Sequence, residues 1–427
     1  MNKRSLVAIA VASTFSALPV IANEKVEDGW DVNGYMSSNV RTVNGKTVDT
    51  EYGRPDYKTA GTHGQSTNQV EFSIINRSTY ENGVRADYVL RSEFGNGNSL
   101  AYSSDGGQYV NNTDGFALKE AYVELHGVLG EETSIWGGQR YLNRAAGLLS
   151  GEFWKQSSGV GAGIETKLAG NTAGIAYILA DAIVNEETDS DVDERATNSS
   201  IDLYYYGVDV GFGSMDFDFK YGQQKAKKGE EDQDGIGLSA TLNSSYYGLD
   251  GWTQTAFGYG TGVMQNRGVN FGNWSGGDDN AESLFITSYG VLNVTDRFQI
   301  GSEIVYMTGI DELFGVDGLT RAMIAARPSY KLNDNMRLEA TLSYADESGL
   351  SVGDWGGEIP TEDHTTSQIF NAEIAMAFTV NADYFGRPQI KPYVSYISAD
   401  DRASAEMIGI TNGTSETVVG VHTEIWF

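Results

Sequence analysis

Residues 134–163 read SIWGGQRYLNRAAGLLSGEFWKQSSGVGAG, and this stretch guides the prediction for the whole chain. It begins in the pattern of a β-strand, which then stops for about twenty residues and returns through the run GVGAG. A loop of that length inside an array of strands is either functional or disordered. This one contains Tyr141, Arg144, Phe153 and Trp154, a mixture that argues against disorder. We therefore predict an ordered, functional loop here.

Polar and apolar residues alternate along most of the chain in blocks of about ten residues, the pattern of a strand with one apolar face. One clear block has Met215, Phe217, Phe219 and Tyr221 on its apolar face and Asp216, Asp218 and Lys220 on its polar face. About eighteen such blocks follow one another, and short connections alternate with long polar ones. A soluble β-sandwich would also alternate, but the strand number and the Arg and Glu residues on polar faces favour a barrel. We predict an all-β protein, a transmembrane antiparallel β-barrel of about 18 strands.

The N-terminal residues 1–22 have the features of a secretory signal peptide. Lys3 and Arg4 precede an apolar run at residues 6–12, and small residues follow near Ala22. The barrel domain is expected to cover residues 23–427. No later stretch is apolar over the roughly 18 residues that a membrane-spanning helix needs.

The composition argues against several other functions. The chain has a formal net charge of −29, which should repel nucleic acid. It has no Cys, so a disulfide framework and thiolate metal sites are excluded. The run GVGAG leads into strand sequence instead of a helix, unlike a phosphate loop, and residues 189–193 lack the Gly and Glu of a calcium loop. The four His are scattered. We predict no enzyme activity, no cofactor and no metal site.

Two aromatic residues near the chain ends are predicted to face the inside of the barrel. By alternation, Tyr35 shares its face with Asp31 and Asn33, and Trp426 shares its face with Glu424 and His422. An aromatic ring that faces water leaves apolar area exposed, at about 25 cal/mol per Å². A sugar would cover such a ring with its C–H face while its hydroxyls bond to charged groups nearby. The alternative is that these rings pack against the inner wall or a loop.

Several of these features resemble the maltoporin (LamB-type) family of sugar-specific porins. The stretch around residue 134 is similar to the family's constriction loop through Ile135-Trp136, Gly138 with Arg140, Phe153 and the returning GVGAG. The C-terminal Glu-Ile-Trp-Phe also resembles the family's ending. The resemblance implies that a constriction loop at about residues 139–160 folds inward into the barrel.

The resemblance also implies a set of sugar-binding residues. The positions that correspond to the family's row of aromatic residues are Tyr35, Tyr109, Phe153, Phe385 and Trp426. The positions that correspond to its polar sugar-binding residues are Lys119, Arg140, Arg144 and Glu152. Phe385 is expected on the penultimate strand. Lys119 has the parity of an apolar position, so either a bulge precedes Glu120 or Lys119 lies at the rim. Ser37, Leu148 and Gly151 depart from the family's polar positions, so the aromatic row matches better than the charged residues.

The resemblance implies passive diffusion of maltodextrins or related oligosaccharides across a Gram-negative outer membrane. It further implies an integral homotrimer in contact with outer-membrane lipid and lipopolysaccharide. The main alternative is a general, weakly cation-preferring porin, which the net charge of −29 would favour. A weaker alternative is an outer-membrane hydrolase that uses a rim acid or His422.

Overall fold

The computed structural model describes residues 28–48, 59–65, 68–95, 117–181, 196–272, 275–276, 280–314, 316–349 and 366–427. Its main sheet has 20 strands, and without the short β2 (Lys46–Val48) and β13 (Asn270–Phe271) there remain the 18 strands of a closed antiparallel barrel. These are β1 (Gly29–Val43), β3 (Asn68–Thr79), β4 (Arg85–Gly95), β5 (Ala117–His126), β6 (Ser134–Ala146), β7 (Phe153–Leu168), β8 (Asn171–Asp181), β9 (Thr197–Asp209), β10 (Gly213–Lys225), β11 (Gln233–Tyr246), β12 (Leu249–Thr261), β14 (Glu282–Thr295), β15 (Phe298–Gly309), β18 (Thr320–Asn333), β19 (Met336–Ser348), β20 (Thr366–Thr379), β21 (Gln389–Ala399) and β22 (Ser415–Trp426). The predicted fold class is confirmed.

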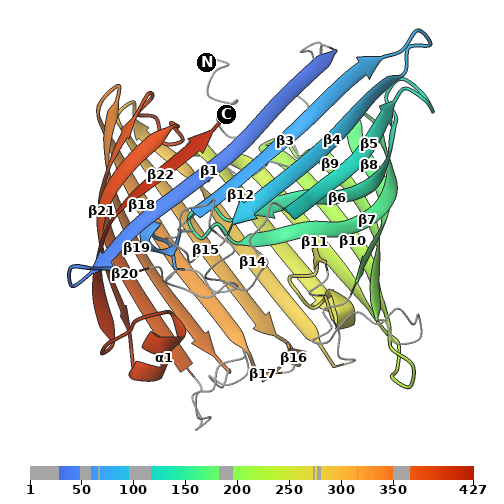
Figure 1. Cartoon of the computed structure of the whole chain (residues 1–427). Coiled ribbons are helices and arrows are strands. Elements are labelled where there is room, and N and C mark those ends of the chain that lie inside the picture. The colour runs from blue at the N-terminus through green and yellow to red at the C-terminus, as the bar shows by residue number, and fades with distance from the viewer. Residues whose placement is uncertain are drawn as a thin grey trace.

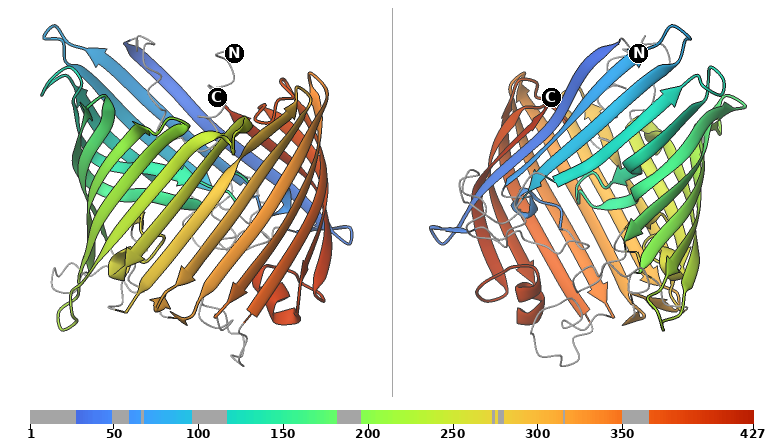
Figure 2. Two further views of the ribbon diagram at one scale, coloured as in Figure 1. Left: turned by 180° about the vertical axis from the view of Figure 1, so that it is seen from behind. Right: turned by 45° about the vertical axis from the view of Figure 1, so that its right-hand side comes forward.

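The barrel closes between the first and last strands, which lie side by side in Figure 2. Tyr35 on β1 is paired with Trp426 on β22 and, on its other side, with Glu71 on β3. Beyond β22 the pairing continues, because the backbone N–H of Gly34 donates to the carbonyl of Phe427 at 2.7 Å. A Cβ at position 34 would overlap the Phe427 ring, so any larger residue there would displace this terminal ring.

Most strands have an apolar outer face and polar residues on the inner face, as their alternating sequences predict. On β20, Phe370, Ile374 and Phe378 are exposed, whereas Asn371 and Glu373 between them are buried inside the barrel. On β8 the inward residues Ala176 and Ile178 are apolar and pack against residues 262–272. The described part of the chain contains no helix that is long and apolar enough to cross a membrane.

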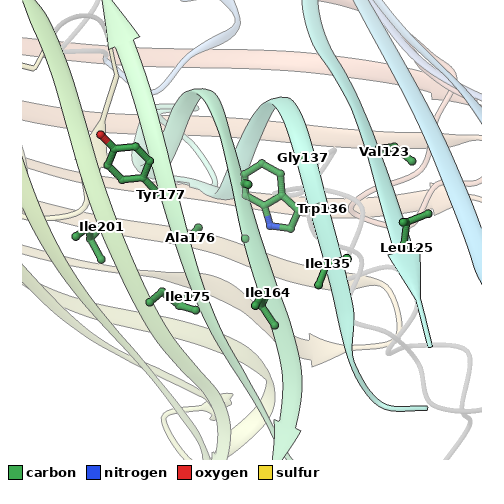
Figure 3. Close-up of a pocket in the computed structure, with 12 residues that line it drawn as sticks. Val123, Leu125, Ile135, Trp136, Gly137, Ile164, Ile175, Ala176, Tyr177 and Ile201 are labelled. Atoms are coloured by element: carbon green, nitrogen blue, oxygen red, sulfur yellow. The ribbon is translucent and has the colours of Figure 1, made fainter. Parts of the chain in front are cut away.

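The outer face also carries an apolar groove of about 740 Å³ across β5 to β9. Figure 3 shows side chains such as Leu125, Ile135, Ile164 and Ile175 around it. The groove lies where Gly137 on β6 carries no side chain.

The two rims of the barrel differ, because short turns lie at one rim and longer connections at the other. The short turns include residues 169–170, 247–248, 296–297 and 334–335. The opposite rim carries α1 (Arg402–Met407) and the small hairpin of β16 (Glu312–Leu313) and β17 (Val316–Asp317), while the C-terminus lies at the short-turn end (Figure 1). This asymmetry is the one predicted from the alternating connections and is typical of outer-membrane barrels.

The prediction that strand structure is interrupted over about residues 139–160 was wrong. β6 continues to Ala146 and β7 begins at Phe153, so residues 147–152 alone connect them. The alternation is lost because the pairing of β6 with β5 ends at Gln139, and β6 continues paired with β7 alone. The β6–β7 pairing then shifts between Leu142 and Ala145, and Asn143 has a positive φ of 53°. An extra residue in a strand reverses which face the following side chains occupy, and period-two pattern disappears from the sequence.

Candidate functional site

Three described segments turn into the barrel from the rim of long connections. The first, residues 59–65, includes the short 3-10 helix η1 (Thr62–Gly64) and lies against the inner wall. Thr62 donates to the Glu373 carboxylate from its backbone N–H at 2.8 Å and from its hydroxyl at 2.6 Å. Asn371 donates to the carbonyl of Ala60 at 2.7 Å. The polar inner residues of β20 thus hold this segment inside the barrel.

The second segment is the β6–β7 tip at residues 147–152, which contacts β15. The Glu303 carboxylate accepts hydrogen bonds from the backbone N–H groups of Leu149 at 2.5 Å and Ser150 at 3.1 Å, and from the Ser150 hydroxyl at 2.6 Å. A Cβ at Gly147 would overlap this carboxylate. Since Glu303 is fully buried on the inner face of β15, the tip lies inside the barrel and away from its own strands.

The third segment, residues 262–272, contains η4 (Gly262–Met264) and β13. It is buried on the inner face of β10 to β12, where its backbone lies directly on wall glycines; a Cβ at Gly237 or Gly260 would overlap the backbone of Gly268 or Met264. β13 also pairs in parallel with the start of β7. This side of the barrel is therefore filled with chain, and open space remains on the other side.

The open space includes a cavity of about 440 Å³ beside the β6–β7 tip. Four of the predicted aromatic residues line it: Tyr35 from β1, Phe153 from β7, Phe385 from the β20–β21 connection and Trp426 from β22. The inward orientation predicted for Tyr35 and Trp426 from alternation agrees with this placement.

Charged groups lie beside the aromatic rings of the cavity. The Arg144 guanidinium stacks on the Phe153 ring, 3.5 Å from its centroid. The Arg387 guanidinium lies 4.7 Å from the centroid of the Trp426 ring and is paired with Glu424. Such an arrangement offers apolar ring faces and strong hydrogen-bonding groups at one place, which is the combination that a sugar requires.

The structure does not bring all predicted residues into this cavity. Arg140 lies elsewhere on β6, 3.3 Å from Glu124 and stacked on the Tyr122 ring at 4.5 Å. Glu152 at the tip is paired with Arg267 of the third inward segment. Glu152 therefore points to the filled side of the barrel, whereas Arg140 is held by residues of β5 that do not line the cavity.

Lys119 shows the bulge that was one of its two predicted explanations. The pairing of β4 with β5 shifts so that Arg91 faces Glu120 and Ser92 faces Leu118, which leaves Lys119 as the extra residue. Its ammonium lies 3.7 Å from Glu93, a residue of the cavity wall.

Two predicted elements, Tyr109 and the signal peptide, lie outside the described residues. Phe385 precedes β21 and does not belong to it, because the connection of residues 380–388 turns inward before that strand begins.

Sequence reasoning missed several residues of the cavity and its surroundings. Tyr384 and Arg387 flank the predicted Phe385, and Arg327 has the inward parity of β18. Burial raises the pKa of Tyr384 to about 12, so its hydroxyl stays protonated at neutral pH. The ring centroids of Trp252 on β12 and Phe385 are 6.3 Å apart. Parity could have indicated both Arg327 and Trp252, because Trp252 shares its face of β12 with the buried Ala256, while Phe257 lies on the exposed face.

No cluster of His, Cys, Asp or Glu that could hold a metal ion occurs among the described residues. Within the same residues, His422 contacts Ser37 at 2.9 Å, and both side chains are buried.

A closed barrel with a polar inner face and an aromatic, charged cavity defines a channel-forming membrane barrel. The model of the LamB porin family matches residues 30–427, and the chain therefore belongs to the LamB porin family. It is an outer-membrane channel and not an enzyme.

Relatives match over the full length of the chain. A protein named Maltoporin from Vibrio cholerae serotype O1 is 24% identical over 454 aligned residues, which cover 100% of both chains. Maltoporin 1 from Klebsiella pneumoniae is 23% identical and covers 99% of this chain and 97% of the relative. Among solved structures, OccAB4 of Acinetobacter baumannii matches with a TM-score of 0.48 at 10% identity, covering 95% of this chain and 100% of that one.

Proposed function

We propose that this LamB-family porin is sugar-specific and lets maltodextrins or related oligosaccharides diffuse passively across the outer membrane. The observation that carries the proposal is the convergence of Tyr35, Phe153, Phe385 and Trp426 on one cavity. These residues come from distant parts of the sequence, and a channel for small ions alone has no use for a row of rings that face water.

The proposed mechanism is a series of weak, exchangeable contacts. The C–H faces of a sugar stack on the rings, and its hydroxyls bond to charged groups such as Arg144 and Arg387. The β6–β7 tip, held by Glu303, narrows the passage at this level. Several weak sites in a row suit a channel, because a solute must both enter and leave.

The naming of full-length relatives as maltoporins supports maltodextrins as the first substrates to test. We also propose that the chain assembles as a homotrimer in contact with outer-membrane lipid and lipopolysaccharide. The molecular mass of the purified protein in detergent tests the trimer, and a monomeric mass would exclude it.

Single-channel recording tests the sugar proposal. Added maltotriose should block the ion current in a manner that saturates with concentration, as expected for a binding site. Neutral polyols of similar size to sucrose, which have no ring face to stack on the aromatic residues, provide the control for non-specific effects of added solute on the current. A current that falls only in proportion to solution viscosity would instead indicate the alternative, a general porin.

A further inference from the structure

Two guanidinium groups in the cavity have no carboxylate partner among the described residues. Arg144 stacks on Phe153 and on Tyr141, at 3.5 and 4.7 Å from the ring centroids, and forms no ion pair within the described part of the chain. Arg327 donates from Nε to the Thr341 hydroxyl at 2.9 Å and likewise forms no ion pair there. Nearby carboxylates act on both groups through space, Glu71 and Glu93 on Arg144 and Glu339, Glu373 and Glu424 on Arg327, but none of these is in direct contact with either guanidinium. The hydrogen-bond donors of both groups therefore have no carboxylate of the described residues bound to them.

The acidic residues of the same wall are, in contrast, all paired. Glu71 pairs with Arg91, Glu93 with Lys119, Glu339 with Lys391 and Glu424 with Arg387. The described lining thus has five basic residues against four acidic ones, and the unpaired surplus is positive. This is opposite in sign to the whole chain, whose net charge is −29.

We propose that the cavity selects acidic oligosaccharides, namely short chains of uronic acid sugars that carry a carboxylate on each ring. The inference rests on the proposed sugar-specific function and narrows its substrate class. A carboxylate accepts two parallel hydrogen bonds from a guanidinium, a geometry that a neutral hydroxyl cannot reproduce. Arg144 covers one face of the Phe153 ring, and the ring is still 37% exposed, so apolar ring surface and a guanidinium lie side by side.

Comparing the block by three trisaccharides in wild-type channels tests the proposal. The probes are trigalacturonate, its fully methyl-esterified form and maltotriose. Esterification leaves the sugar rings in place and removes the charge. The half-blocking concentration of trigalacturonate should be about tenfold lower than that of the ester, since two accessible charge pairs are expected to form. The difference between the two half-blocking concentrations should be smaller at high salt, because salt screens the attraction between the sugar carboxylates and the guanidinium groups.

The outcomes separate this inference from the proposed function. Block by maltotriose with equal block by acid and ester overturns the acidic preference and leaves the sugar-specific porin in place. Absence of block by all three sugars overturns both. Monomeric galacturonate that blocks as strongly as the trisaccharide would also overturn the inference, because it would indicate a general anion site.

Two double variants link the charge preference to the named residues. In Arg144→Gln with Arg327→Gln, the ratio of half-blocking concentrations for ester and acid should fall to about one. In Arg144→Lys with Arg327→Lys, the charges remain and most of the ratio should persist. A ratio that is unchanged in the Gln variant, recorded from folded channels, overturns the assignment. The wild-type comparison stays decisive if a variant does not fold.

Discussion

Replacing Glu303 with Ala should detach the β6–β7 tip from the inner wall and widen the channel. The substitution removes the only acceptor that the structure gives to three donors among the described residues: the N–H groups of Leu149 and Ser150 and the Ser150 hydroxyl. Glu303 lies on the inner face of β15, so the substitution leaves the backbone ladder of the barrel intact.

The size of the effect follows from those three bonds. A hydrogen bond to a charged group contributes about 1.5–3 kcal/mol. The three share one carboxylate, and water can reach the freed donors, so a loss of about 3–5 kcal/mol is expected in place of the simple sum. A loss of about 3 kcal/mol would increase the detached population of the tip by roughly a hundredfold.

Single-channel recording provides the assay. Glu303→Ala should raise the mean conductance and the open-channel noise, and it should weaken the maltotriose block. Ser150→Ala, which removes one of the three donors, is the matched control and should show a smaller change of the same sign. Conductance and noise equal to the wild type in Glu303→Ala would show that this carboxylate does not hold the tip in place.

Three further substitutions test other parts of the structure. Phe153→Ala removes a ring from the cavity wall and should weaken maltotriose block while raising ion conductance, both measured in single channels. Arg387→Gln leaves Glu424 without its ion-pair partner and should shift the reversal potential in a salt gradient toward cations. Gly237→Ala forces a Cβ against the backbone of Gly268 and should destabilise the barrel by about 1–3 kcal/mol, measured by denaturant unfolding.

Each of these changes has a matched control. Phe370→Ala, on the outer face, should leave block and conductance unchanged. Arg387→Lys keeps the charge and should keep the reversal potential. Gly137→Ala places its Cβ 3.9 Å from the nearest atom and should not alter stability. An equal effect in the control and the test variant would contradict the corresponding prediction.

The barrel could be predicted from sequence because its wall is built from a local rule. Apolar and polar side chains must alternate along a strand that separates an apolar from a polar environment. On β10, Phe217 is exposed on the outer face and the neighbouring Asp218 is buried on the inner face. The same rule placed Tyr35 and Trp426 on the inside. The rule failed after Gly138, because β6 leaves its pairing with β5 at Gln139, and the shifted pairing and positive φ near Asn143 then change which face each side chain occupies.

The remainder of the candidate site could not be predicted because it depends on contacts between distant segments. Glu303 meets a tip that lies about 150 residues earlier in the chain, and Glu373 meets Thr62 from more than 300 residues away. Neither pairing has a local pattern. Residues 59–65 are short and irregular, so no periodicity marks them as an inward segment.

The glycine-lined wall beneath residues 262–272 has a consequence for how such channels diversify. An eighteen-strand scaffold is wide, and the aperture is determined by the segments laid inside it more than by the number of strands. Insertions, deletions or substitutions in those segments can thus change the width of the channel while the number of strands in the barrel stays the same. Selection can act on what passes through without rebuilding the part that inserts into the membrane.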